Sequence, residues 1–189
     1  MGSRRCNLSF SCVCAPVLAR LSRDARVDIK RAAAIGHSAG GHLALWLGGK
    51  HRLPKNSVLY TEQNQWLIAA ISLAGVTDLS MVWKLRLGDS AVGKLIGRSP
   101  DQYPKRYVET SPLELLPMGL KQVLIHGRAD EDVPISQSER FVQRAKAAGD
   151  GSSLVSLDGF GHLELKDPES RAWDAVVHST LAALEDEIR

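Results

Sequence analysis

Short apolar runs alternate along the chain with longer segments in which apolar residues recur at helical spacing. The apolar runs have the length of strands and are too short for buried helices. The run 66–75 contains one polar side chain, Ser72, which is typical of a strand covered on both faces, as in a parallel sheet. We therefore predict four strands, at residues 31–35, 66–75, 122–127 and 153–157.

Segments with a helical pattern follow these strands. The first runs from Ser38 to about Lys50, where Gly48 and Gly49 favour an end to the helix. Two further helices are predicted at residues 134–148 and 168–188, each with its apolar side chains on one side. A repeated order of strand and helix predicts the α/β class. We expect a three-layer sandwich in which helices cover both faces of a parallel sheet.

The segment between the second and third predicted strands is long and irregular. Its short helical patterns are interrupted by glycines and prolines, at Gly88, Gly93, Gly97, Pro100 and Pro104. We predict a cap-like excursion from the sheet at about residues 76–110, and a short helix at 111–116. The domain as a whole is expected to span residues 24–189, after a poorly specified lead-in at 1–23.

The composition excludes several classes of protein. The chain has 189 residues, of which 44% are hydrophobic and 24% are charged, with a net charge of +3. Basic and acidic residues are interspersed, which argues against a nucleic-acid-binding surface. No apolar run is long enough to span a membrane, and the apolar stretch near the start is too short and too polar for a signal peptide. We expect a cytoplasmic protein without nucleic-acid or membrane partners.

The three cysteines lie close together near the start of the chain, at Cys6, Cys12 and Cys14. An odd number at one end does not form a disulfide framework. Their spacing, without neighbouring histidines, does not fit a zinc site. We therefore predict no metal.

A Gly-x-Ser-x-Gly motif lies where the first predicted strand meets its helix. Gly36 and Gly40 flank Ser38, and a tight turn from strand to helix needs small residues beside the serine. The hydroxyl would project from this turn, and the backbone N–H of Ala39 would point toward an oxyanion formed beside it. Ser38 is therefore the predicted nucleophile and Ala39 the predicted oxyanion donor.

A serine nucleophile needs a base, and the base needs an acidic group to orient it. In this architecture the chain order is serine, acid, histidine. His162 follows the fourth predicted strand, and both Asp130 and Asp132 follow the third. We favour Asp130 because it lies on the turn that leaves the strand, whereas Asp132 could cap the next helix. All these groups lie at carboxyl ends of strands, where such sheets hold their sites.

The remaining histidines have other expected roles. His37 neighbours the nucleophile, and we expect it to line the site and contact substrate. His42 lies one turn after Ser38 and is expected to pack or to form a hydrogen bond. His126 ends a buried strand and is expected to be structural, whereas His51 and His178 are expected at the surface.

Three segments together resemble the α/β-hydrolase superfamily, in its branch of esterases, lipases and prolyl-oligopeptidase-like enzymes. They are Gly36–His42, His126–Pro134 and Gly161–Glu164. The last segment, with Asp167 and Pro168 after it, is particularly similar to small bacterial esterases and kynurenine-formamidase-like hydrolases. The resemblance covers about residues 24–189 and implies the α/β-hydrolase fold, with no organic cofactor.

The chain also departs from the pattern of this superfamily. Full members have several strands before the elbow, where a His-Gly-Gly loop supplies further oxyanion donors, and no such motif precedes Ser38 here. The resemblance therefore implies an N-terminally truncated fold. Loss of one oxyanion donor lowers the rate by about 100- to 1000-fold. The outer edge of the elbow strand would be open unless residues 1–30 or another chain cover it, which favours self-association.

The function expected from these residues is hydrolysis of carboxylic esters or small amides. Ser38 would attack the acyl carbon, His162 would move the proton and Asp130 would orient His162. Two alternatives stay open: a serine peptidase of the prolyl-oligopeptidase type, and an inactive domain that only retains the triad residues. Apolar residues of the excursion would either line an acyl pocket or pack the excursion onto the domain, namely Trp83, Leu85, Leu87 and Leu95.

Overall fold

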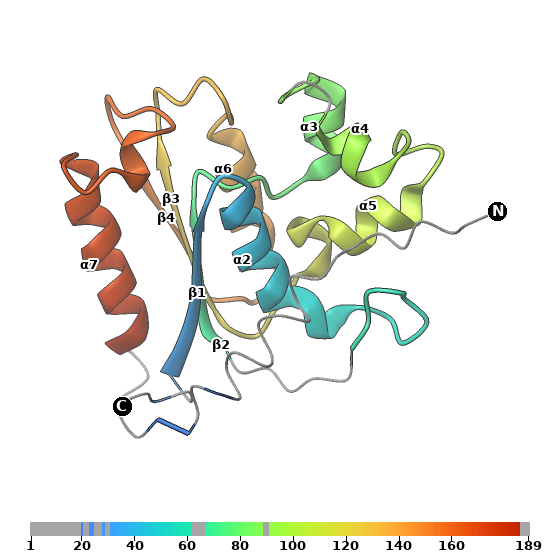
Figure 1. Cartoon of the computed structure of the whole chain (residues 1–189), viewed down its shortest axis with the longest axis horizontal. Helices are drawn as coiled ribbons and strands as arrows, with labels where there is room; N and C mark the ends of the chain where they lie inside the picture. Colours follow the sequence, from blue (N-terminus) through green and yellow to red (C-terminus); the bar gives the residue numbers. More distant parts are fainter. Residues whose placement is uncertain are drawn as a thin grey trace.

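Four parallel strands form the sheet at the centre of the computed structural model (Figure 1). The structure describes residues 20, 23–24, 28, 31–61, 67–88 and 91–185. Neighbouring strands are consecutive in the chain, in the order β1-β2-β3-β4, so their carboxyl ends meet at one edge. The strands are β1 (Ala32–His37), β2 (Leu67–Leu73), β3 (Lys121–Gly127) and β4 (Ser152–Leu157).

Helices cover both faces of this sheet. The helices α2 (Ala39–Gly49) and α6 (Ser136–Ala147) pack on one face, and α7 (Ala172–Glu185) packs on the other (Figure 1). The predicted three-layer α/β architecture is therefore confirmed. In the described part of the chain, no helix combines the length and the apolar character that a membrane span requires.

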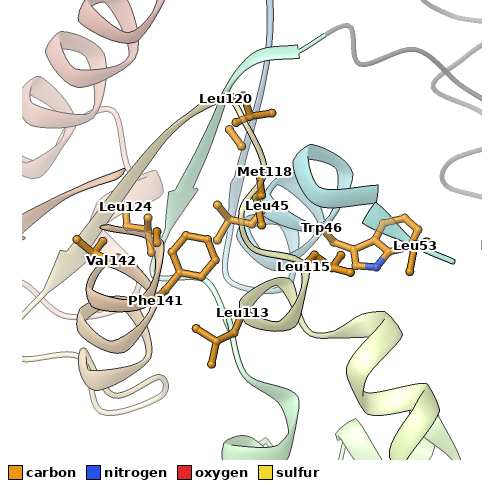
Figure 2. Close-up of a cluster of buried hydrophobic side chains, with 12 residues drawn as sticks. Leu45, Trp46, Leu53, Leu113, Leu115, Met118, Leu120, Leu124, Phe141 and Val142 are labelled. Carbon is orange, nitrogen blue, oxygen red and sulfur yellow. The ribbon is translucent and has the colours of Figure 1, made fainter. Parts of the chain in front are cut away.

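The core on the α2 side is the larger of the two that flank the sheet (Figure 2). Leu45 of α2 and Phe141 of α6 are both fully buried there, and Leu124 of β3 lies between the two helices and the sheet. Successive side chains of a strand point to opposite faces. Accordingly Ala70 and Leu124 contribute to this core, whereas Ile71 and Val123 contribute to the core under α7.

The segment between β2 and β3 leaves the carboxyl edge of the sheet and forms three short helices, the third of which lies beside α2 (Figure 1). They have an apolar cluster of their own, to which Leu79, Val82, Ile96 and Tyr107 contribute. Trp83 and Leu87 pack against that cluster, whereas Leu85 and Leu95 are about half exposed. The elements are α3 (Leu79–Leu85), α4 (Ala91–Ile96), α5 (Pro104–Thr110) and the 3-10 helix η3 (Pro112–Leu115).

The last helix begins later than its apolar pattern predicts. Residues 168–171 form turns instead, because the Ser170 hydroxyl accepts a hydrogen bond from the N–H of Ala172 at 3.1 Å. Asp167 likewise accepts one from the N–H of Glu169 at 2.9 Å. Side chains that bond nearby backbone N–H groups are typical of helix starts. Two further 3-10 helices are η2 (Lys50–Arg52) and η4 (Glu164–Lys166).

β1 lies at one end of the strand order and, among the described strands, pairs only with β2. Ile35 in its middle is 48% exposed. Most of residues 1–30, which the sequence suggested as a cover for this edge, fall outside the described part of the chain. Self-association through this edge stays a prediction.

Candidate active site

Ser38 lies on the turn between β1 and α2 in a backbone conformation that side chains rarely adopt. Its φ is 57° and its ψ is −119°. Such a conformation costs about 1–3 kcal/mol and persists only where the surroundings impose it. Two hydrogen bonds do so here: the N–H of Ser38 donates to the carbonyl of Leu73 at 2.8 Å, and its own carbonyl accepts from the N–H of His42 at 3.0 Å. The strained geometry fits a nucleophile elbow.

Of the two glycines that flank Ser38, only Gly36 is crowded. A Cβ on Gly36 would lie 2.3 Å from the backbone of Gly40, which leaves no room for a side chain. A Cβ on Gly40 itself would have no atom within 4 Å. The expectation that both glycines must be small is therefore correct for Gly36 and wrong for Gly40. The second crowded position is Gly41, where a Cβ would lie 2.7 Å from the Ser72 hydroxyl.

Asp130 leaves the end of β3 with both carboxylate oxygens engaged. Oδ1 accepts from the backbone N–H groups of Asp132 and Val133, at 3.0 and 2.8 Å. Oδ2 accepts from Nδ1 of His162 at 2.7 Å. The carboxylate is fully buried, whereas Asp132 is exposed. Of the two acids that the sequence left open, Asp130 is the one bonded to His162.

Close backbone packing brings the His162 loop to Asp130. A Cβ on Gly127 would lie 2.2 Å from the carbonyl oxygen of Phe160, so only glycine lets the loop approach the end of β3 this closely. The N–H of Ala129 donates to the same carbonyl at 2.9 Å. Because a carboxylate only accepts hydrogen bonds, Nδ1 of His162 carries the proton, which leaves Nε2 able to accept one.

Ser38 and His162 are linked through His37. Nε2 of His37 lies 2.7 Å from the carbonyl oxygen of His162, and the two imidazole rings are 4.5 Å apart between centroids. No direct hydrogen bond joins the hydroxyl of Ser38 to His162, both of which are described residues. Such bonds are often long in ligand-free sites and tighten when substrate binds. A contact between His37 and substrate stays a prediction.

His126 lies closer to the site than the sequence suggested. It is fully buried, and its Nε2 is 3.3 Å from Oδ2 of Asp130 and 2.9 Å from the carbonyl of Val133. Its Nδ1 lies 2.8 Å from the hydroxyl of Ser138. Burial lowers the pKa of this imidazole. His126 ends a buried strand four residues before Asp130, but this spacing alone does not specify that the loop between them turns back to form the contact.

His42 is buried on α2, and its Nδ1 lies 3.0 Å from the carbonyl oxygen of Val76. Burial lowers its pKa from 6.5 to about 4, so the ring is neutral at pH 7. The expected packing and hydrogen-bonding role is therefore correct. His51 and His178 are exposed, as expected.

Asp130, Asp132 and His162 offer ligand atoms that lie within 4.8 Å of one another. Within this group, Nδ1 of His162 donates a hydrogen bond to Oδ2 of Asp130. A metal ion bound through those two atoms would have to replace the proton between them. The hydrogen bond fits proton transfer by His162.

The predicted oxyanion donor, Ala39, is the first residue of α2. Backbone N–H groups in the first turn of a helix have no partner within the helix and carry a partial positive charge. The N–H of Ala39 is thus one donor next to Ser38. Its role as an oxyanion donor stays a prediction.

Several known proteins are similar to much of this chain. The sequence model of the BD-FAE family matches residues 18–145. The uncharacterized peptidase YuxL of Bacillus subtilis is 30% identical over 148 residues, which cover 75% of this chain and 20% of that protein. The esterase LipC of Mycobacterium tuberculosis is 27% identical over 136 residues, which cover 69% of this chain and 34% of LipC.

A solved structure shows the same fold. A truncated form of a carbohydrate esterase from gut microbiota superposes with a TM-score of 0.73 at 21% identity, over 90% of this chain and 66% of that chain. The matched part of the chain spans about a fifth of YuxL and a third of LipC.

Proposed function

The chain belongs to the BD-FAE family and has the fold of the α/β-hydrolase superfamily, and from this premise we propose that it is a serine hydrolase of carboxylic esters or small amides. Ser38 is the nucleophile, His162 the general base and acid, and Asp130 the group that orients His162. The observation that carries the proposal is the 2.7 Å bond from His162 Nδ1 to the buried carboxylate of Asp130.

In the first half of the reaction, Nε2 of His162 takes the proton from the Ser38 hydroxyl as its oxygen attacks the acyl carbon. The carbonyl double bond opens, and its electron pair forms an oxyanion that the N–H of Ala39 stabilises. His162 then gives its proton to the leaving alcohol or amine as the bond to the acyl carbon breaks. The products of this half are the acyl-enzyme and the free leaving group.

In the second half, water replaces the leaving group. His162 takes a proton from the water, whose oxygen attacks the acyl carbon, and returns the proton to Ser38 as the acid is released. Asp130 stays ionised throughout and stabilises the imidazolium form of His162. Its Oδ1 is held by two backbone N–H groups, so the carboxylate keeps its orientation during both halves.

The test is hydrolysis of p-nitrophenyl acetate and butyrate by the purified protein, together with labelling by a fluorophosphonate probe. Ser38→Ala should abolish both turnover and labelling, because it removes the oxygen that forms the acyl-enzyme. Ser153→Ala, at an exposed position of β4, is the matched control and should change neither. Turnover that persists in Ser38→Ala, or wild-type protein that neither turns over nor labels, would contradict the proposal.

A second candidate, cleavage of peptides by the same residues, is favoured by the 30% identity to a protein named as a peptidase. The steps are the same, with an amine as the leaving group. Aminoacyl p-nitroanilides beside the p-nitrophenyl esters separate the two activities. A kcat/KM for the anilides that approaches that for the esters would favour the peptidase.

A further inference from the structure

His37 bridges the two segments that would have to meet during catalysis. It is the last residue of β1 and precedes Ser38 directly, so its backbone is part of the strand that ends in the elbow. Its side chain reaches the carbonyl of His162 at 2.7 Å. This hydrogen bond connects the elbow to the loop that carries the proposed base.

The ring nitrogen of His37 that carries the hydrogen can be identified from its bonding partner. A carbonyl oxygen only accepts hydrogen bonds, so Nε2 of His37 must carry the hydrogen and donate it. A neutral imidazole does this without adding a charge. Burial lowers the pKa of His37, and the titratable groups that face it are His162, Lys166 and Asp130. A neutral His37 therefore adds no positive charge beside the imidazolium that His162 forms.

The contact between the rings adds a second constraint on His162. The two rings are tilted by 52° with centroids 4.5 Å apart, so the two imidazoles are in contact. Asp130 holds the same ring through Nδ1. Ring contact alone is non-directional, whereas the hydrogen bond ties the backbone of the loop to the end of β1, next to Ser38.

We propose that His37 is a positioning residue, whose Nε2–H holds the carbonyl of His162 and so sets the distance between the base and Ser38. The proposal rests on the serine hydrolase function proposed above. Asp130 fixes the ring of His162, and His37 fixes the backbone to which that ring is attached. The two contacts approach His162 from different segments, the turn after β3 and the end of β1.

Two substitutions separate the hydrogen bond from the ring contact. His37→Phe keeps an aromatic ring and removes the donor, whereas His37→Gln keeps an N–H donor at a similar reach and removes the ring. A displacement of the base by about 1 Å costs about 100-fold in rate. We therefore expect His37→Phe to lower kcat for p-nitrophenyl acetate by about 10- to 100-fold. KM should stay within about twofold, and His37→Gln should restore kcat to within about threefold of wild type.

A second measurement does not depend on turnover. The Nδ1 proton of His162 is bonded to Asp130 and can be followed by proton NMR in wild type and variants. Exchange of this proton with water should accelerate by about tenfold or more in His37→Phe, because the loop loses its anchor, and should stay near the wild-type rate in His37→Gln. Circular dichroism and size-exclusion chromatography check that each variant is folded.

The outcomes separate the two proposals. Wild-type turnover no higher than that of Ser38→Ala would overturn the proposed function, whatever the NMR shows. Ser38-dependent turnover with unchanged kcat and unchanged exchange in His37→Phe would overturn the positioning role alone. So would a rise in KM at constant kcat, which would instead support contact between His37 and substrate. An equal loss in both variants would assign the effect to the ring and overturn the role of the donor.

Discussion

At the scale of single residues, backbone crowding decides where the site accepts a side chain. Gly36 faces the backbone of Gly40, and Gly127 faces that of Phe160, each at little more than 2 Å from an added Cβ. Real Cβ atoms do not come this close to backbone atoms, so a substitution must displace one of the two segments. These displacements would reach Ser38 in the first case and His162 in the second.

A pair of alanine substitutions tests this crowding. Gly36→Ala should lower the free energy of unfolding by more than about 2 kcal/mol, because the elbow must open to admit the methyl group. Gly40→Ala adds the same group to open space inside α2 and should be neutral or stabilising by up to about 1 kcal/mol. Urea unfolding measures both, and similar losses in the two variants would refute this account of the turn.

The choice between the two acids is also testable at this scale. Asp130→Asn replaces an oxygen bonded to His162 and favours the wrong tautomer of that ring, which costs about 10⁴-fold in kcat in a comparable triad. Asp132→Asn changes an exposed side chain two residues away and is the matched control, with kcat expected within about twofold. Steady-state hydrolysis of p-nitrophenyl acetate compares them. The assignment fails if Asp132→Asn has the larger effect.

The sequence predicted the residues that would take part in the chemistry more easily than the residues that matter because of tertiary contacts. The hydrogen-bonded pair of Asp130 and His162 follows from motifs with a known chain order, so both residues were predicted. The contact of His126 with Asp130 depends on the path of the loop after β3, which no local pattern specifies. The crowding at Gly41 likewise depends on Ser72 and Gly75, which belong to a different strand and its exit turn.

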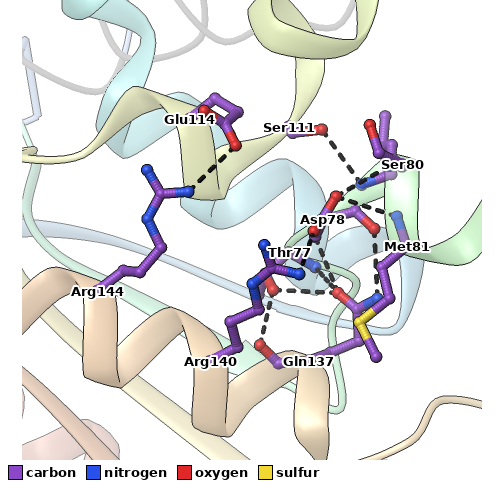
Figure 3. A network of polar contacts seen from close by, with 10 residues as sticks. Thr77, Asp78, Ser80, Met81, Ser111, Glu114, Gln137, Arg140 and Arg144 are labelled. Carbon is purple, nitrogen blue, oxygen red and sulfur yellow. Dashed lines mark hydrogen bonds and ion pairs between the residues drawn. The ribbon is translucent and has the colours of Figure 1, made fainter. Parts of the chain in front are cut away.

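At the scale of elements, a buried polar network joins the excursion to α6 (Figure 3). Oε1 of Gln137 accepts from the backbone N–H groups of Thr77 and Asp78, at 3.0 and 2.8 Å. Asp78 caps α3 through the N–H groups of Ser80 and Met81, and its other oxygen pairs with Arg140 at 3.1 Å. Asp78 follows β2 at the carboxyl edge of the sheet, where the proposed site lies. Its carboxylate, however, holds the start of α3 and Arg140 of α6.

Removing the amide of Gln137 tests how much this network contributes. Gln137→Leu leaves two buried N–H groups without their partner and should cost about 2–5 kcal/mol of unfolding free energy. Gln143→Leu makes the same change at an exposed position of α6 and should stay within about 0.5 kcal/mol of wild type. Equal midpoints of urea denaturation in the two variants would show that the network is not stabilising.

The boundaries of the elements were predictable to different degrees. Strand positions follow from apolar runs, and β2, β3 and β4 lie within two residues of their predicted limits. The start of α7 was misjudged because Asp167 and Ser170 bond the backbone in turns, although the apolar pattern continues through them. Polar side chains that bond backbone N–H groups determine where such a helix begins. The spacing of apolar residues carries no information about these hydrogen bonds.

At the scale of the whole molecule, buried neutral histidines link stability to pH. The pKa of His42 is lowered to about 4 in the fold, and burial also lowers the pKa of His37 and His126. Between pH 6.5 and 4 the unfolded chain therefore binds more protons than the folded one. The stability contributed by the neutral rings is complete above pH 6.5 and is lost as the pH falls toward 4.

For His42 alone, the loss between pH 7 and pH 5 is about 2 kcal/mol. Urea unfolding at the two pH values measures it. His42→Asn keeps an N–H donor near the carbonyl of Val76 but cannot be protonated, so it should reduce the pH dependence by this amount. His178→Asn, at an exposed position, should leave the pH dependence unchanged. An unaltered slope in His42→Asn would refute the linkage.

The hydrogen bond between His37 and His162 joins residues 125 positions apart in the chain. A ribosome adds about 5–20 residues per second, so His162 is synthesised roughly 6–25 s after His37 and Ser38. During that interval the nascent polypeptide carries a serine without its base. The proposed chemistry needs β4 and the loop after it, so we expect a chain whose translation stops before His162 to lack the proposed activity.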